Sequence, residues 1–250
     1  MIRNRLFFKE VLTLRKNSKK SNLDYVKEVA KNFLYVEIEK TEFSPMIVIH
    51  PFFDSGIVGG TVNKKIEFFN IVENDDDLQY VRLQFEKKIE QCNSVYEVFN
   101  LIRKPYRITF FKYVHNELSI DDYSILLSEI WTMSENPNVD MNVSVKTLIK
   151  WFTKSDKKIL MDEYEYKAYT KLSEEINIFR GVGTKSNPNG ISWTTDFNVA
   201  KWFAKRWDNG GYIIKAKIRK NSILAYYLRR NEFEIVADIN DIMKTGIIEI

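Results

Sequence analysis

The feature that most constrains this fold is a change in the spacing of apolar residues near residue 176. Between 76 and 175, apolar residues recur every three or four positions, as in Leu78, Val81 and Phe85, and this spacing predicts amphipathic helices. After 176, apolar and polar residues alternate, as they do between Tyr212 and Arg219, and this pattern predicts strands. Helices followed by a run of strands are typical of an α+β fold.

The alternation divides the last third of the chain into short strands. We predict strands at 176–181, 191–194, 212–219, 223–228, 232–236 and 247–250. One helix, at 197–207, interrupts them, and either Thr195 or Asp196 is in position to cap its first turn. Asn209-Gly210-Gly211 is a typical end for that helix.

The first 75 residues predict shorter elements of both kinds. The spacing predicts a helix at 25–33 and strands at 34–39, 46–49 and 62–71, and we place Gly56, Gly59 and Gly60 in a loop. We therefore divide the chain into two regions. Region 1–103 is an N-terminal α/β elaboration to which the sequence assigns no role. Region 104–250 is one domain, with a helical part at 104–175 and a strand core at 176–250.

Cysteine and histidine are scarce in this chain. Cys92 is the single cysteine, and His50 and His115 are the two histidines. One cysteine excludes an intramolecular disulfide, and these three residues have no zinc-binding spacing. We therefore expect no metal site, and neither zinc catalysis nor thiol redox chemistry.

Basic residues are concentrated at the start and in the last third. The net charge is +4, yet residues 1–20 carry seven Lys or Arg against Glu10, and residues 176–250 carry twelve against seven acids. Such regions attract nucleic acid, phosphate-bearing ligands or acidic partners, and they serve equally well as solvated surface. No apolar run reaches the roughly 18 residues of a membrane helix, and the start lacks a signal-peptide pattern. We expect a cytoplasmic protein without a membrane partner.

Three short motifs lie in the strand-rich part of the chain. The first is Arg180-Gly181, at the end of a predicted strand. The second is Ser192-Trp193-Thr194 in the next strand, and the third is Glu232-Phe233-Glu234. Taken singly, each motif has an ordinary structural explanation: a surface arginine with a turn, a cross-strand pair and a solvated strand face.

Together, the three motifs supply the groups needed to break the bond between nicotinamide and ribose in NAD. Alternate residues of a strand point to the same side, so the carboxylates of Glu232 and Glu234 are predicted to lie together. Arg180 can bind phosphate oxygens with its planar guanidinium. Ser192 can hydrogen-bond a neighbouring carboxylate and fix its direction. A carboxylate in this position stabilises the oxocarbenium ion that forms as the bond breaks.

On these motifs, residues 176–250 resemble the Arg-Ser-Glu class of mono-ADP-ribosyltransferases, which includes bacterial arginine-modifying toxins. That class has an arginine at the end of its first core strand and a Ser-Thr-Ser motif on the next strand, followed by an alanine and a phenylalanine. A Glu/Gln-x-Glu motif then leads into aliphatic residues. The matching residues here are Arg180, Ser192, Thr194, Ala200, Phe203, Glu232 and Glu234. Trp193 departs from the pattern, while Thr194 keeps the hydroxyl of the last serine.

The resemblance implies a role for each residue. Glu234 is the implied catalytic carboxylate, Ser192 orients it, and Glu232 positions or deprotonates the incoming nucleophile. The implied NAD-binding residues are Arg180, Gly181, Ser192, Trp193 and Thr194. The resemblance also implies a split β-sandwich core, preceded by a helical segment that closes one side of the NAD site, and residues 104–175 are available for that segment.

The predicted function is that of an NAD-dependent mono-ADP-ribosyltransferase toxin that releases nicotinamide. Its acceptor is either protein arginine, which the Glu-x-Glu form favours, or an RNA or DNA base, which the basic residues 1–20, Lys215, Lys217 and Arg219 favour. A toxin of a toxin–antitoxin or phage-defence system implies a neutralising antitoxin or immunity protein. Two alternatives stay open: an NAD glycohydrolase, and a non-catalytic binding module on the same fold.

Overall fold

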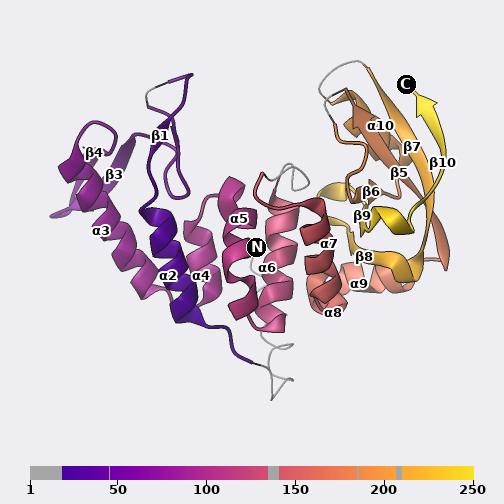
Figure 1. The fold of residues 1–250 in the computed structure, drawn as a ribbon, viewed down its shortest axis with the longest axis horizontal. Helices are drawn as coiled ribbons and strands as arrows, with labels where there is room; N and C mark the ends of the chain where they lie inside the picture. The colour runs from indigo at the N-terminus through magenta and orange to yellow at the C-terminus, as the bar shows by residue number, and fades with distance from the viewer. Residues whose placement is uncertain (1–18, 45, 135–140, 185, 207–209) are drawn as a thin grey trace. The chain divides into compact units, whose positions relative to one another are not determined.

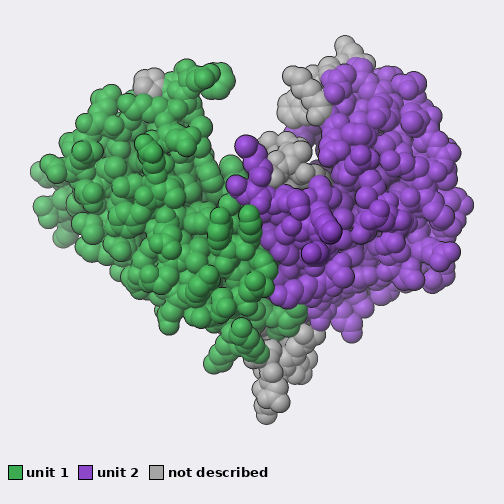
Figure 2. Space-filling model, viewed as in Figure 1, with its two compact units in different colours: residues 1–122 green, residues 123–250 purple. Residues whose placement is uncertain are grey.

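The structure is a computed structural model that describes residues 19–44, 46–134, 141–184, 186–206 and 210–250. Most of the predicted basic segment 1–20 lies outside these residues. The chain divides into two compact units, residues 1–122 and 123–250, which are coloured separately in Figure 2. This division differs from the predicted boundary at 103/104 because α5 (Arg107–Val114) packs within unit 1. There, the Phe110 ring makes edge contacts with the rings of Phe33 and Phe99.

Unit 1 is mainly helical (Figure 1). Its helices are α2 (Leu23–Leu34), α3 (Asp75–Gln91), α4 (Val95–Leu101), α5 and the first residues of α6 (Ile120–Met133), with single 3₁₀ turns at Lys104–Tyr106 and His115–Glu117. Asn22, Asn74 and Ser94 each accept a hydrogen bond from a first-turn N–H at the start of α2, α3 and α4. These caps satisfy donors that the helices themselves leave unpaired.

Two short antiparallel pairs complete unit 1. Strand β1 (Glu39–Lys40) pairs with β2 (Val48–Ile49), and β3 (Ile57–Val62) pairs with β4 (Lys65–Asn70). The strand predicted at 34–39 is wrong over most of its length, since Leu34 is the buried last residue of α2. The loop predicted around Gly59 and Gly60 is also wrong, because both lie in β3. The hairpin turns instead at Asn63 and Lys64, which both have positive φ, as a tight hairpin turn requires.

The helices of unit 2 lie within 76–175, where the apolar spacing predicts helices, and within 197–207, where one further helix is predicted. They are the remainder of α6, α7 (Val145–Lys154), α8 (Lys157–Leu160), α9 (Glu163–Thr170) and α10 (Phe197–Lys205). Of the two candidate caps for α10, Asp196 is the one that accepts the first-turn N–H bonds, from Asn198 and Val199. Trp207 and Asn209, which we expected at the end of this helix, lie outside the described residues. None of the described helices is long and apolar enough to cross a membrane.

A six-stranded antiparallel sheet forms the centre of unit 2, with the order β10-β7-β5-β6-β9-β8. Its strands are β5 (Glu175–Gly183), β6 (Ser192–Thr194), β7 (Gly211–Arg219), β8 (Ile223–Tyr227), β9 (Glu234–Ala237) and β10 (Met243–Glu249), with 3₁₀ turns at Lys220–Ser222, Arg229–Asn231 and Ile239–Asp241. The chain is therefore a mixture of helix and sheet, compatible with the predicted α+β class.

The sheet consists of two halves that meet at a single residue pair. Strands β5 and β7 pair over the whole length of both, whereas β5 and β6 pair only at Phe179 and Thr194. Helix α10 packs on β5 and β7, where a Cβ at Gly181 would lie 1.9 Å from the Ala200 carbonyl oxygen. Helices α7, α8 and α9 pack against β8, in the other half (Figure 1). Each half of the sheet thus has its own helical cover.

Two predicted strand limits need correction near the motifs. The strand carrying Arg180 does not end there, because β5 continues to Gly183. The strand predicted at 232–236 begins only at Glu234. Arg230, Asn231 and Phe233, just before it, have positive φ and cannot belong to a strand. The last strand starts earlier than predicted, at Met243 instead of Ile247, and its pairing with β7 has a bulge between Lys244 and Gly246.

Candidate active site

The carboxylate of Glu234 lies at the start of β9 and is held by two hydrogen bonds. Its Oε1 atom accepts one from the Ser192 hydroxyl at 2.6 Å and one from the Trp131 indole N–H at 3.0 Å. Ser192 belongs to the neighbouring strand β6, and Trp131 belongs to α6. The side chain is buried, and the described residues provide no hydrogen bond to Oε2. One carboxylate oxygen is therefore anchored by two donors, and the other accepts no hydrogen bond from the described residues.

The surroundings of Glu234 act on its protonation in opposite directions. Burial has the largest effect and raises the pKa of the Glu234 carboxyl. The hydrogen bonds from Ser192 and Trp131 lower that pKa, because both donors favour the carboxylate. The charge of Glu232 raises it, and that of Arg230 lowers it. Glu234 thus remains protonated to a higher pH than an exposed glutamate.

Arg180 reaches the same region from β5. Its Nη1 donates to the Ser192 carbonyl oxygen and its Nη2 donates to the Asn187 carbonyl oxygen at 2.7 Å, while the buried Nε has no partner among the described residues. A Cβ at Gly190 would lie 2.3 Å from Nη2, so that position accepts no side chain without displacing the guanidinium. Burial lowers the pKa of Arg180 to about 10, and the charge of Glu234 opposes this effect. Arg180 is therefore still a cation at neutral pH.

Two of the predicted NAD-binding residues have clear packing roles. Trp193 is buried, and its indole N–H donates to the Gly190 carbonyl oxygen at 3.2 Å. Gly181 allows the backbone of α10 to approach β5, as described above. Thr194 has a connecting role: its hydroxyl donates to the Glu232 carbonyl oxygen at 2.7 Å and accepts from the Asp196 N–H at 3.0 Å. It thus joins the residues before β9 to the N-terminus of α10.

Glu232 does not lie where the sequence predicts. Its backbone is helical rather than extended, with φ −89° and ψ −14°, so it does not share a strand face with Glu234. The left-handed backbone of Phe233 separates the two residues. The Glu232 carboxylate instead accepts a hydrogen bond from the Arg230 guanidinium at 3.1 Å. The argument from strand alternation is therefore wrong for this pair, although the charge of Glu232 still acts on Glu234.

An ion pair between the buried Glu165 and the partly exposed Arg229 fixes the loop that carries Glu232. The Glu165 carboxylate, on α9, accepts from Nε and Nη2 of Arg229 at 3.1 and 3.2 Å. The same carboxylate accepts from the backbone N–H groups of Leu228 and Asp162 at 3.1 and 3.0 Å. We call residues 228–233 the β9-entry loop, and the Glu165–Arg229 pair its clamp. The clamp holds this loop to the helical layer of unit 2.

Sequence reasoning missed four residues of this site. Trp131, Glu165, Arg229 and Gly190 each contact one of the predicted residues or their loop. Trp131 lies in an apolar helix, where an aromatic residue predicts only core packing. Glu165 forms a capping box with Asp162, a local role that explains its type without any distant partner. Arg229 and Gly190 are close in sequence to the motifs, and this closeness is the one sequence signal that could have indicated a role in the site.

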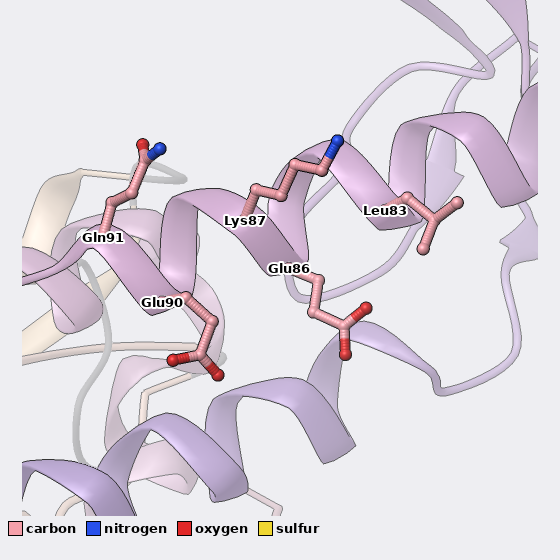
Figure 3. Close-up of a pocket in the computed structure, with 5 residues that line it drawn as sticks. All are labelled: Leu83, Glu86, Lys87, Glu90 and Gln91. Carbon is pink, nitrogen blue, oxygen red and sulfur yellow. The ribbon is translucent and has the colours of Figure 1, made fainter.

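The described residues offer little for other kinds of site. Those residues contain no group of three or more His, Cys, Asp or Glu that could hold a metal ion. A shallow open pocket lies in unit 1 and is lined by five residues of one helix, Leu83, Glu86, Lys87, Glu90 and Gln91 of α3 (Figure 3). It contains none of the motif residues, and Glu90 is already paired with Lys31.

Comparisons of this chain with models of protein families, with curated proteins and with solved structures found no match.

Proposed function

We propose that this chain is an NAD-dependent mono-ADP-ribosyltransferase that transfers ADP-ribose to a macromolecular acceptor and releases nicotinamide. The observation that carries the proposal is the hydrogen bond from the Ser192 hydroxyl to Oε1 of Glu234 at 2.6 Å. This bond joins the motif that contains Ser192 to the motif that contains Glu234, through the hydroxyl and the carboxylate that the proposed reaction uses. Arg180, from the remaining motif, donates to the carbonyl oxygen of the same Ser192.

The proposed reaction breaks the bond between C1′ of the nicotinamide ribose and the nicotinamide nitrogen. The bonding electrons leave with nicotinamide, and positive charge develops on the ribose as an oxocarbenium ion. Glu234, with Oε1 fixed by two donors, presents Oε2 to this charge and stabilises it without reorganising. An acceptor atom then forms a new bond to C1′ and loses its proton.

Arg180 is suited to the diphosphate of NAD. A buried guanidinium is costly, and its lowered pKa reflects that cost. An anionic diphosphate nearby would offset the cost, since the two charges then compensate one another. Arg180 also fixes the segment from Asn187 to Ser192 through two carbonyl oxygens, so it positions Ser192 as well.

The fold adds indirect support. The single residue pair between β5 and β6 leaves the sheet in two halves, as a split β-sandwich core would require. Helix α6, which precedes this sheet in the chain, supplies Trp131 to Glu234. A helical segment before the first core strand is what the resemblance implies.

The biological setting follows the same proposal. We propose a cytoplasmic toxin that is controlled by a neutralising antitoxin or immunity protein and acts in a toxin–antitoxin or phage-defence system. Its acceptor is a protein arginine or a base of RNA or DNA, and the exposed Lys215 and Arg219 on β7 are compatible with nucleic acid.

Purified full-length chain, incubated with NAD labelled in its adenosine part and with a cell lysate, tests the proposal. The Glu234→Gln variant is compared with Glu174→Gln, which changes an exposed carboxylate outside the site. We expect nicotinamide release and labelled macromolecules with the wild type and with Glu174→Gln, and neither with Glu234→Gln.

The fate of the label separates the alternatives. Loss of macromolecular label on protease treatment identifies a protein acceptor, and loss on nuclease treatment identifies a nucleic acid. Nicotinamide and free ADP-ribose without labelled macromolecules identify an NAD glycohydrolase. No nicotinamide release by the wild type overturns the proposal and favours the non-catalytic binding module.

A further inference from the structure

The hairpin of β3 and β4 in unit 1 has one covered face and one open face (Figure 1). On the covered face, the Phe69 ring stacks on the Tyr80 ring of α3, with the ring centroids 4.7 Å apart. Alternation turns Ile66 and Phe68 to the opposite face, where they are 76% and 74% exposed. Their cross-strand neighbours on β3 are a threonine and a glycine, which cover little of either side chain. A regular strand thus leaves two large apolar side chains in contact with water.

The backbone of the same two residues is also available for pairing. Val62 and Lys65 flank the two-residue turn of the hairpin and form its first hydrogen-bonded pair. Hydrogen-bonded and non-hydrogen-bonded pairs alternate along an antiparallel ladder, so the N–H and C=O groups of Ile66 and Phe68 point away from β3. Among the described residues, neither has a hydrogen bond outside the hairpin. Strand β4 therefore presents an open sheet edge.

This open edge is short. The Asn70 N–H points the same way as those of Ile66 and Phe68, but it donates to the Asp77 carboxylate at 2.7 Å. A sheet edge without proline, a bulge or a covering element is a template for another strand. The part of β4 that can receive one is therefore centred on Ile66 and Phe68.

The charges beside Ile66 make this edge complementary to itself. Lys65 and Glu67 are both exposed, and no other described residue forms an ion pair with either. In an antiparallel pair of identical strands, a two-fold axis at Ile66 places each Lys65 opposite the second copy's Glu67. The two Ile66 side chains then face each other on the open face, and each Phe68 lies diagonally from the second copy's Ile66. Opposite charges and apolar side chains are thus paired on their separate faces.

Other positions of the axis are less favourable. An axis at Glu67 would place two carboxylates directly opposite each other, which is destabilising. An axis at Phe68 would place Ile66 opposite the second copy's Asn70, whose N–H is already bound to Asp77. The axis at Ile66 avoids both conflicts.

We infer that β4 is a self-association site, at which a second copy of this chain adds its own β4 antiparallel, with the two-fold axis at Ile66. The two Ile66 residues exchange N–H···O bonds, and the hairpins form one continuous sheet with the order β3-β4-β4-β3. The open face of that sheet brings together the Ile66 and Phe68 side chains of both copies. The occupant is a second copy because the sequence Lys65-Ile66-Glu67 is complementary to itself. The inference goes beyond the proposed function and does not depend on it.

Sedimentation velocity of the full-length chain from about 1 to 300 μM tests the inference, because so short a contact lies at the weak end of specific interfaces. Lys65→Glu and Glu67→Lys each place like charges opposite each other in the proposed pair. The double variant Lys65→Glu with Glu67→Lys exchanges the charges and restores the opposition. Lys87→Glu, the same charge change at an exposed position of α3, is the matched control. Circular dichroism checks the fold of each variant.

We expect a wild-type dimer whose dissociation constant rises by at least about tenfold in each single variant. The double variant should return to within about threefold of the wild type, and Lys87→Glu should not differ from it. A mixture of the two single variants should form a mixed dimer, since each lysine of one copy then faces a glutamate of the other. One variant carries a larger tag so that the mixed dimer has its own mass. Unfolding of a single variant could not produce either recovery.

Three results would overturn the inference. A wild type that stays monomeric up to about 300 μM excludes self-association at this edge. A dimer that both single variants form as readily as the wild type is held by another surface. Weakening in the single variants without recovery in the double variant or the mixture rules out the axis at Ile66. Each of these results leaves the proposed function standing.

Discussion

Strand β9 and the β9-entry loop are adjacent in the chain, and each presents one glutamate of the same motif. Glu234, in the strand, is buried and anchored through Oε1 by Ser192 and Trp131. Glu232, in the loop, is partly exposed and paired with Arg230, two residues away. The strand has regular extended geometry, whereas three loop residues have left-handed backbones.

Two carboxylates that are two residues apart in the sequence are therefore not equivalent in the structure. A regular strand would have placed both on one face, with like charges side by side. The left-handed Phe233 ends that alternation and gives each glutamate its own partners. Glu234 thereby has a buried carboxylate with one fixed oxygen. Glu232 has a partly exposed carboxylate that accepts from a guanidinium.

The largest effect is expected from Glu234→Gln. The variant keeps the size of the side chain and can still accept the two hydrogen bonds at its amide oxygen, so the fold should be retained. It loses the negative charge that stabilises the oxocarbenium ion. We expect nicotinamide release to fall by about 10²–10⁴-fold. Circular dichroism and thermal unfolding check the fold, and retention of full turnover would contradict the assignment of Glu234.

The second effect concerns the loop and its clamp. Glu165→Gln leaves Arg229 and the Leu228 N–H with a weaker partner in a buried position. We expect the unfolding free energy to fall by about 2–3 kcal/mol, less than for a fully buried pair because Arg229 is 33% exposed. Glu163→Gln, an exposed change on the same helix, should alter it by less than about 0.5 kcal/mol. Urea unfolding measures the unfolding free energy of both variants. Equal losses would show that the clamp contributes no more stability than an exposed carboxylate.

Much of unit 2 was predictable because its local signals agree with its packing. The alternation in β7 and the candidate cap Asp196 predict elements that the structure contains. The resemblance implies that Ser192 orients Glu234, and the structure contains a hydrogen bond between these side chains, across the paired strands β6 and β9.

The rest depends on tertiary contacts that leave no pattern in the sequence. Trp131 is 103 residues from Glu234, and Glu165 is 64 residues from Arg229. The alternation in Glu232-Phe233-Glu234 predicts a strand, because none of these residue types requires a left-handed backbone at Phe233. Contacts with distant segments hold this loop, among them the clamp and the bond from the Thr195 N–H to the Phe233 carbonyl, and the strand pattern of period two does not extend into it.

The third effect tests the anchor of Glu234. Trp131→Phe keeps an aromatic ring against Phe152 but removes the indole donor. Loss of a donor to the carboxylate raises the already raised pKa of Glu234. Because the reaction needs the carboxylate, the acidic limb of the pH profile for nicotinamide release should move to higher pH. Turnover at neutral pH should fall by about tenfold and recover partly as the pH rises.

Ser192→Ala serves as the parallel variant for this prediction. It removes the other donor to Oε1 with less change in volume, so it should move the acidic limb in the same direction. A purely structural role for Trp131 would lower turnover equally at every pH. A pH profile that falls without shifting would therefore assign Trp131 to packing alone.

The smallest effect on nicotinamide release is expected from Glu232→Gln. It should shift the acidic limb of the pH profile in the direction opposite to that expected for Trp131→Phe. The charge of Glu232 raises the pKa of Glu234, so its removal lowers that pKa and moves the acidic limb of nicotinamide release to lower pH. The shift should be small, since the Glu232 side chain is 25% exposed and solvent screens its charge.

Turnover of NAD with water as acceptor should stay within about twofold, because Glu232 acts on the acceptor and not on the leaving group. Transfer to an added small guanidine compound should fall by about tenfold or more. If instead Glu232→Gln abolished nicotinamide release as Glu234→Gln does, the two glutamates would act as one unit, and the distinction between strand and loop would fail.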